Sequence, residues 1–236
     1  MNNSTIQIKV KQRLNKLASN DYDNIQPWQI VEAFNKGMVD WCRRNLHGTN
    51  SKQEGDEQST RRIDDLQILL KETGNLTMVK KDLFYETVGE LPADYLQWKR
   101  VDVRSTKECC TDPRLMKVYL VEEANIVEIL RDDNKKPSFV WGETISTLKT
   151  NKLRVYTNND FEVSSTNLSY YKQPRKIEIV GTSNPYTQTT TTVEVECEFK
   201  DDLVELFIDE AVKILAGDIE SIIQMQRAGQ SVETNN

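Results

Sequence analysis

The chain has 236 residues and a formal net charge of −6, and 37% of its residues are hydrophobic. This length is enough for one large domain or two small ones with a real hydrophobic core. The 37 acidic side chains outnumber the 31 basic ones, which argues against a dedicated nucleic-acid binder, because such proteins carry a basic excess. The sequence has neither a signal peptide nor an apolar run that could span a membrane, so we expect a protein made in a cytoplasm with reduced cysteines.

Two helices are expected near the N-terminus. Residues 6–19 have Val10, Leu14 and Leu17 at helical spacing, and an Asn/Asp-rich break follows at 19–24. A second helix should begin near Pro27, a residue suited to a first turn, and end near Gly48. Its apolar face consists of Val31, Phe34, Met38, Trp41 and Leu46.

A polar segment and a third helix come next. Residues 48–59 contain no aliphatic side chain, so they are expected to form a loop. Residues 60–72 predict a helix, with Ile63, Leu66, Leu69 and Leu70 facing inward.

The middle of the chain changes to the two-residue period of strands. The alternation at 98–104 predicts one face with Trp98, Arg100, Asp102 and Arg104 and another with Val101 and Val103. A short helix is expected at 122–131, and a polar loop or exposed hairpin at 181–192. Further strands are expected at 76–88, 116–121, 153–157, 168–172 and 176–180.

The last element is the clearest helix. It should begin at Asp201 or Asp202, both good N-cap residues, and run to about Arg227. Its apolar stripe comprises Val204, Phe207, Ile208, Ala211, Leu215, Ile219 and Ile222, of which we expect Phe207 and Ile208 to be core residues. The acidic residues of its first turns favour the helix dipole and are expected to face solvent: Asp201, Asp202, Glu205, Asp209 and Glu210.

These elements predict an α+β fold. Residues 1–75 and 200–228 should form a helical bundle from the two ends of the chain. Residues 76–199 should form an inserted β-rich domain, and residues 229–236 a mobile tail.

No motif for catalysis or metal binding is found in the sequence. Cys42, Cys109, Cys110 and Cys197 lack the spacing of a zinc site, and the one histidine, His47, lies at an expected helix end. The glycines form no phosphate-binding loop, and the acidic run after Asp201 is better explained by helix-dipole chemistry than by a two-metal site. We therefore expect a protein that is not an enzyme and uses no cofactor or metal.

The charges are unevenly distributed along the chain. Residues 1–46 carry seven basic and four acidic side chains, whereas residues 194–220 carry ten acidic and two basic ones. The two ends could pair within one subunit or between neighbouring subunits, or they could form two separate solvated faces.

Three stretches together resemble the head–tail connectors of tailed bacteriophages. They are residues 90–101 (ELPADYLQWKRV), the pair 153–156 (LRVY) and 167–174 (NLSYYKQP), and residues 199–211 (FKDDLVELFIDEA). In this order they are similar to the tail-adaptor ring proteins of the podovirus tubular protein A type. The many Asn, Lys and Ile residues hint at an AT-rich genome, such as that of a crAss-like phage. The segments 48–59, Cys109-Cys110 and the Thr-rich 186–192 depart from the pattern.

The resemblance implies a structural subunit of a homo-oligomeric, dodecameric ring at the head–tail junction of the virion. The partners would be the portal protein and downstream tail or ring proteins, and DNA would pass through the ring without specific binding. A tail that orders only on a partner should place Arg227, Gln230 and Val232 in the contact with the portal or a neighbouring subunit. The alternatives are another tail-ring or tail-completion protein, a nucleic-acid-binding regulator that uses Lys9, Lys11, Arg13 and Lys16, and a cell-wall hydrolase.

Overall fold

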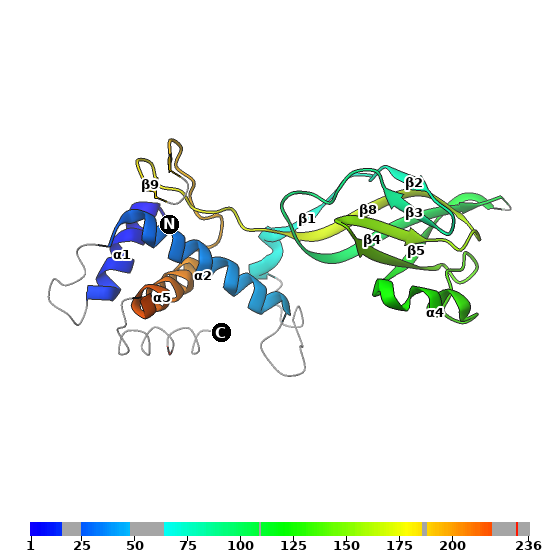
Figure 1. Cartoon of the computed structure of the whole chain (residues 1–236), viewed down its shortest axis with the longest axis horizontal. Coiled ribbons are helices and arrows are strands. Elements are labelled where there is room, and N and C mark those ends of the chain that lie inside the picture. Colours follow the sequence, from blue (N-terminus) through cyan, green and yellow to red (C-terminus); the bar gives the residue numbers. More distant parts are fainter. Residues whose placement is uncertain (16–24, 48–63, 109, 186–187, 219–229, 231–236) are drawn as a thin grey trace. The chain divides into compact units, whose positions relative to one another are not determined.

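The computed structural model describes residues 1–15, 25–47, 64–108, 110–185, 188–218 and 230 (Figure 1). The chain divides into two units, Met1–Leu69 with Pro174–Asn236 and Leu70–Gln173, which we call the helical unit and the strand unit. The α+β class is confirmed, since both helices and a large sheet are present. The strand unit begins and ends earlier in the sequence than the 76–199 that we expected.

Three helices from the two ends of the chain pack together in the helical unit (Figure 1). They are α1 (Asn3–Asn15), α2 (Pro27–His47) and α5 (Asp201–Asp218). Asn2 begins α1, since its Oδ1 accepts a hydrogen bond of 2.8 Å from the backbone N–H of Thr5. Both α2 and α5 begin where the sequence predicts, and most of the expected apolar positions are buried: Val10, Leu14, Phe34, Met38, Trp41, Val204, Phe207, Ile208, Ala211 and Leu215. Leu17 and the expected part of the last helix after Asp218 lie outside the described residues.

The prediction of the third helix is wrong at the C-terminal end of that helix. Residues 67–69 form a 3₁₀ turn, η1 (Gln67–Leu69), and the chain then becomes a strand, β1 (Leu70–Glu72). Leu70 is 48% exposed instead of facing inward, and it pairs in register with Tyr171. The backbone groups of β1 therefore find partners on a neighbouring strand, which a helical periodicity cannot reveal. Residues 60–63 lie outside the described part of the chain.

The strand unit contains one eight-stranded sheet with the order β1-β8-β4-β5-β6-β7-β3-β2. All of its neighbouring strands are antiparallel except β5 and β6. The remaining elements are β2 (Met78–Lys80), β3 (Phe84–Thr87), β4 (Tyr95–Lys107), β5 (Cys110–Leu120), η2 (Glu123–Asn125), α4 (Ile126–Arg131), β6 (Glu143–Lys149), β7 (Lys152–Tyr156) and β8 (Glu162–Lys172).

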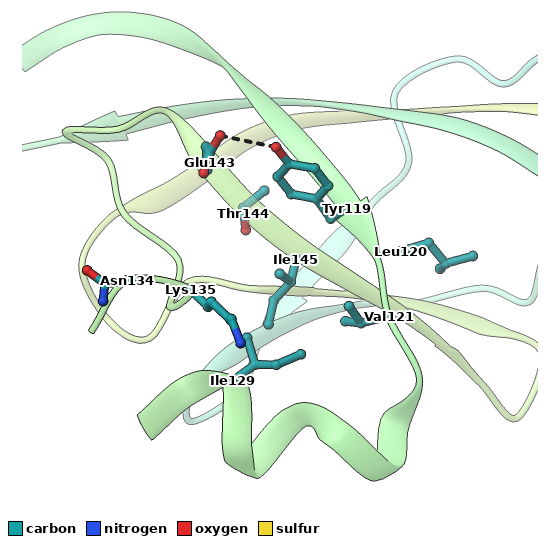
Figure 2. Close-up of a pocket in the computed structure, with 9 residues that line it drawn as sticks. All are labelled: Tyr119, Leu120, Val121, Ile129, Asn134, Lys135, Glu143, Thr144 and Ile145. Atoms are coloured by element: carbon teal, nitrogen blue, oxygen red, sulfur yellow. Dashed lines mark hydrogen bonds between the residues drawn. The ribbon is translucent and has the colours of Figure 1, made fainter. Parts of the chain in front are cut away.

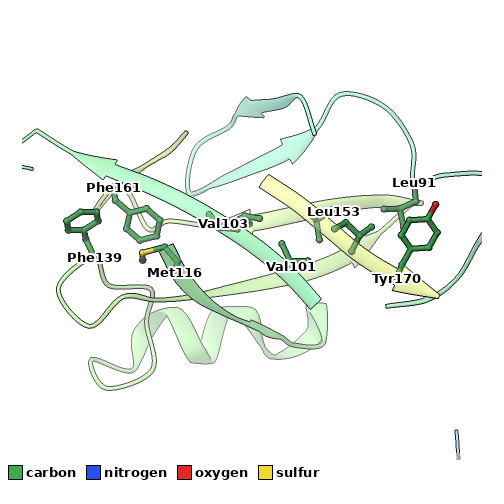
Figure 3. Packing of buried hydrophobic residues seen from close by; sticks show 10 residues of the cluster. Leu91, Val101, Val103, Met116, Phe139, Leu153, Phe161 and Tyr170 are labelled. Atoms are coloured by element: carbon green, nitrogen blue, oxygen red, sulfur yellow. The ribbon is translucent and has the colours of Figure 1, made fainter. Parts of the chain in front are cut away.

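The partner of β5 changes along its length. Residues up to Met116 pair with β4, whereas Lys117–Leu120 pair with β6. The two halves of the sheet enclose one core, to which β4 contributes Val101 and Val103 and β7 contributes Leu153 (Figure 3). On the other side of β6 and β7, a smaller cluster joins these strands to α4.

The predicted alternation of β4 fails at one residue. Val101 and Val103 are buried as expected, but Trp98 packs against the same core instead of lying beside Arg100. The register shifts between Trp98 and Arg100, which marks a β-bulge. A bulge inserts one residue, so it moves every side chain before it to the opposite face.

The predicted strand at 176–180 is not formed. Glu178 makes only an isolated bridge to Val195, and the backbone of Ile177 binds the Asn35 side chain of α2 through both its N–H (2.8 Å) and its carbonyl (3.2 Å). The hairpin expected at 181–192 is present as two short strands, β9 (Ser183–Asn184) and β10 (Thr189–Thr190).

Gly37 of α2 lies against α5 with no room for a side chain. A Cβ atom added to it would lie 2.9 Å from Cβ of Glu210 and 3.5 Å from the backbone N of Ala211. We therefore expect Gly37→Ala to lower the free energy of unfolding by about 1 kcal/mol, because overpacking of about 1–3 kcal/mol exceeds the helix-propensity gain of about 1 kcal/mol. Urea denaturation would measure this, with Gly74→Ala as the control, since nothing lies within 4 Å of a Cβ there. A stabilised Gly37→Ala protein would show that the two helices can separate without cost.

Candidate functional site

The residues that the sequence singled out for partner binding are only partly described. Gln230 is helical and exposed, while Arg227 and Val232 lie outside the described residues. His47 is the last residue of α2 and Cys110 the first of β5, whereas Cys109 is not described. Within the ranges that the structure covers, no group of three or more His, Cys, Asp or Glu side chains is arranged to hold a metal ion.

Cys42 is a buried thiol on α2. Burial raises its pKa to about 12, and the nearby charges of Glu198 and Cys197 add to this effect. The thiol is therefore protonated at neutral pH. It acts as a small apolar side chain in the core and has none of the reactivity of a thiolate.

The oppositely charged ends of the chain pair with each other inside the helical unit. Lys9 and Arg13 of α1 form ion pairs with Glu205, and Arg13 also pairs with Asp209. Burial of Glu205 tends to raise its pKa, but the hydrogen bond from Lys9 and the charge of Arg13 outweigh this effect and lower the pKa. Of the three arrangements that the sequence left open, the structure shows pairing within the subunit.

The expectation that all acidic residues of α5 face solvent is wrong. Glu210 is only 6% exposed, and Arg44 of α2 pairs with it. The helical spacing of the sequence places Glu210 beside apolar residues of α5, but it does not show that a cation from another helix pairs with Glu210. Asp201 and Asp202 are exposed, as expected.

Asp94 holds together the start and the end of the strand unit. Its carboxylate accepts hydrogen bonds from the Tyr170 hydroxyl of β8 (2.7 Å) and from Lys71 of β1 (2.8 Å). Its backbone carbonyl accepts one from the N–H of Gln173 (2.7 Å). The hydrogen bond from Lys71 is the main cause of the lowered pKa of Asp94; burial opposes this effect, and the Tyr170 hydroxyl adds to it.

We expect Asp94→Asn to lower the free energy of unfolding at neutral pH by about 1–2 kcal/mol, since the ion pair and a charged hydrogen bond are lost. Because the pKa of Asp94 is lowered in the folded state, its contribution is present above the unfolded pKa of about 3.9 and is lost as the pH falls through the folded value. The difference between the two proteins should therefore shrink below about pH 4 in a series of urea titrations. Asp102→Asn is the control and should change little, because Arg100, the ion-pair partner of Asp102, has a side chain that is 65% exposed. A pH-independent difference would contradict the electrostatic explanation.

A second polar cluster, centred on Glu123, joins η2 to β6 and β7. Glu123 accepts hydrogen bonds from Thr147 (2.8 Å), Lys149 (2.9 Å) and Arg154 (2.9 Å). Arg154 also binds Glu86 at 2.8 Å. Each charged group of the cluster pairs with a group of opposite charge. The cluster therefore fits a structural role better than proton transfer.

One pocket, of about 380 Å³, lies between α4 and the β5–β6 pair (Figure 2). Val121, Ile129 and Ile145 are among its apolar lining residues, and Tyr119 donates a hydrogen bond to Glu143 at 3.2 Å. Its lining contains no histidine, cysteine or arginine. The pocket suits an apolar side chain of a partner better than a substrate undergoing reaction.

Several apolar side chains of β5 and of the loop before β6 are exposed. Trp141 and Val140 are 79% and 72% exposed on the loop before β6, and Leu115 and Tyr119 are 61% and 41% exposed on β5. Arg114 ties the loop to β5, because its guanidinium donates to the carbonyls of Phe139 (2.9 Å) and Val140 (3.0 Å). Contiguous patches of exposed aromatic and aliphatic groups are typical of surfaces that bind other proteins. Sequence patterns do not reveal such exposed groups, because exposure depends on which side chains cover a residue.

Comparison with known proteins gives no identification. No protein-family model matches the chain, and no curated protein matches it. Among the helices in the described ranges, none has the length and apolar character needed to cross a membrane.

Proposed function

We propose that this chain is a structural virion protein, a subunit of the ring that connects the portal to the tail of a bacteriophage. The helices from the two ends of the chain would form the bundle that builds the ring. Twelve copies would surround a conduit through which DNA slides without specific binding. An acidic protein suits such a conduit, because it repels the DNA backbone.

The observation that carries this proposal is the contact between two of the three stretches that resemble connectors. Asp94 comes from the first stretch and Tyr170 from the second, and they share a hydrogen bond of 2.7 Å. The third stretch begins with Phe199 and continues into α5. Two stretches that are weak signals individually thus contact each other in the fold.

The mass of the purified protein, alone and mixed with the portal protein of the same phage, tests the proposal. We expect a ring complex with the portal in which the number of subunits matches the symmetry of the portal. Deleting residues 227–236 should leave a folded protein that attaches more weakly. A full-length chain that never joins the portal would contradict the proposed place in the virion, and a deletion that attaches normally would contradict the role of Arg227, Gln230 and Val232.

The alternative of a nucleic-acid-binding regulator depends on the basic residues of α1, and two of these are already engaged. Lys9 and Arg13 pair with carboxylates of α5, so their charges are not available to phosphates. We expect binding to duplex DNA at physiological salt with a Kd of about 10⁻⁴ M or weaker, the weak end of non-specific binding. Fluorescence anisotropy at several salt concentrations would measure it. A sub-micromolar Kd that rises steeply with salt would favour the regulator.

A further inference from the structure

The hairpin that carries β9 and β10 has one edge whose backbone groups are unpaired (Figure 1). Glu178 and Val195 exchange two backbone hydrogen bonds of 3.0 Å, which fixes the antiparallel register of its two segments. The residues on either side of such a bonded residue direct their N–H and C=O groups away from the partner segment. Glu194 and Glu196 therefore direct theirs to the edge, and neither forms a backbone hydrogen bond with any residue that the structure describes. We call residues 192–196 the free edge.

The sequence around the free edge favours a longer strand than the one present. Residues 189–195 read TTTTVEV, so six of these seven side chains are β-branched, the type that favours strands. Strand β10, however, comprises only Thr189–Thr190 and pairs only with β9. A two-stranded hairpin is marginally stable in water, and a third strand would supply partners for the unpaired backbone groups. The free edge thus combines strand-forming side chains with the absence of a neighbouring strand among the described residues.

The helices hold the base of the hairpin and cover its other edge. The side-chain amide of Asn3 in α1 donates to the carbonyls of Glu178 and Val195, both at 3.0 Å, and Asn3 is fully buried. Asn35 of α2 binds both backbone groups of Ile177, which point to the edge opposite the free one. A surface fixed in this way loses little conformational entropy when a partner binds it.

The side chains of the free edge divide into an acidic face and an apolar face. Glu194 and Glu196 are exposed on one face, and neither forms an ion pair with a described residue. Val193 and Val195 lie on the other face. Val193 is 66% exposed, and the register places it opposite Val180, which is 53% exposed. Residues opposite each other on antiparallel strands share a face, so an added strand would place alternate side chains beside the carboxylates and beside the valines.

We infer that the free edge binds an extended segment of another protein in which basic and apolar residues alternate. Basic side chains opposite Glu194 and Glu196 would pair with the two exposed carboxylates, and the apolar residue between them would cover Val195. The backbone groups of Glu194 and Glu196 would supply the hydrogen bonds, while the alternation of charge would supply the specificity. This inference goes beyond the proposed function and does not depend on it.

A second copy of this chain does not offer such a segment. The sequence has two places where one apolar residue separates two basic ones, Lys9–Lys11 and Lys152–Arg154. The first lies in helix α1, and the second lies in β7, which pairs with β3 on one side and with β6 on the other. Neither can pair with a further strand while the chain is folded, so the partner is a different protein.

A short synthetic peptide in which Lys and Val alternate, with both ends capped, is the probe for the full chain. Isothermal titration calorimetry would measure its Kd. We expect Glu194→Gln combined with Glu196→Gln to raise the Kd about tenfold, because two cross-strand ion pairs are lost. The matched control is Glu178→Gln, which removes an exposed carboxylate from the other segment and from the opposite face of the hairpin. It should leave the Kd unchanged.

Two changes of the probe separate strand addition from simple attraction between charges. A peptide of the same composition, with its Lys and Val residues in separate blocks, should bind about tenfold more weakly, since it cannot match both faces at once. N-methylation of the Lys amides should abolish binding, because these N–H groups would donate to the carbonyls of the free edge. N-methylation of the Val amides, which would face solvent, should not weaken it.

Amide hydrogen exchange gives the structural readout. In the free protein, the amides of Glu194 and Glu196 should exchange faster than that of Val195, which donates to Glu178, and the peptide should slow the exchange of the first two. The inference would be overturned by unchanged exchange at these amides, by equal binding of the alternating and block peptides, by equal effects of the double substitution and its control, or by no measurable binding. A chain that binds the peptide in this way but never joins the portal would support the inference and contradict the proposed function.

Discussion

Replacing Phe207 by alanine should lower the free energy of unfolding by about 3–5 kcal/mol. The Phe207 side chain is fully buried on α5, and three aromatic rings surround it edge-to-face. The ring centroids of Phe199, Trp41 and Phe34 lie 5.1, 5.4 and 5.9 Å away. The substitution would remove these contacts and leave a cavity that the surrounding side chains cannot fill without moving.

Urea denaturation followed by circular dichroism would measure this loss. Leu206→Ala is the matched control, because the neighbouring Leu206 is only partly buried, and it should cost about 1 kcal/mol. If the two substitutions had equal effects, the aromatic cluster would not be the main source of stability in the helical unit.

Replacing Arg44 by methionine should cost about 2–3 kcal/mol, because it removes the cation that accompanies a buried carboxylate. The Glu210 side chain is only 7% exposed, so it cannot regain water when its partner is lost. A fully buried pair would cost about 3–5 kcal/mol, but the Arg44 side chain is 34% exposed and solvent already screens part of the interaction.

A double-mutant cycle would separate the ion pair from the packing of the arginine stem. Arg44→Met combined with Glu210→Gln should recover much of the lost stability, since the uncompensated charge is then removed. Arg43→Met is the control at the adjacent exposed position and should change stability by less than about 0.5 kcal/mol. An additive double mutant would mean that the two side chains do not stabilise each other.

The helices were predictable because their signals are local. Pro27 begins α2, Asp201 begins α5, and Phe207 and Ile208 are buried, all as the sequence indicates. A helix satisfies its backbone within its own segment, so spacing and capping residues are sufficient to predict it.

The errors arise where a distant segment decides the outcome. Leu70 leaves the helical pattern because β8 offers it a pairing edge, and Trp98 turns to the core because a bulge shifts its register. Strand β6 was missed, because Thr144, Ile145, Ser146 and Thr147 are all buried and the strand shows no alternation. Its β-branched residues after Gly142 were the available signal.

The ion pairs of the candidate site were less accessible still. The uneven charge along the sequence was visible, but only the fold shows that Lys9 and Arg13 form ion pairs with carboxylates of α5. The hydrogen bonds of Asp94 with Tyr170 and Lys71 join residues that are far apart in the sequence, and no pattern within one segment encodes them.

The strand unit begins and ends on adjacent strands, since Leu70 of β1 is in register with Tyr171 of β8. Paired residues of antiparallel strands have Cα atoms about 5 Å apart, which is a gap that a tight turn can close. The two ends of the strand unit are therefore as close together as the two ends of a short loop. Such an arrangement lets evolution exchange or lose the inserted module as a cassette, while the surrounding helices keep their sequence and their packing.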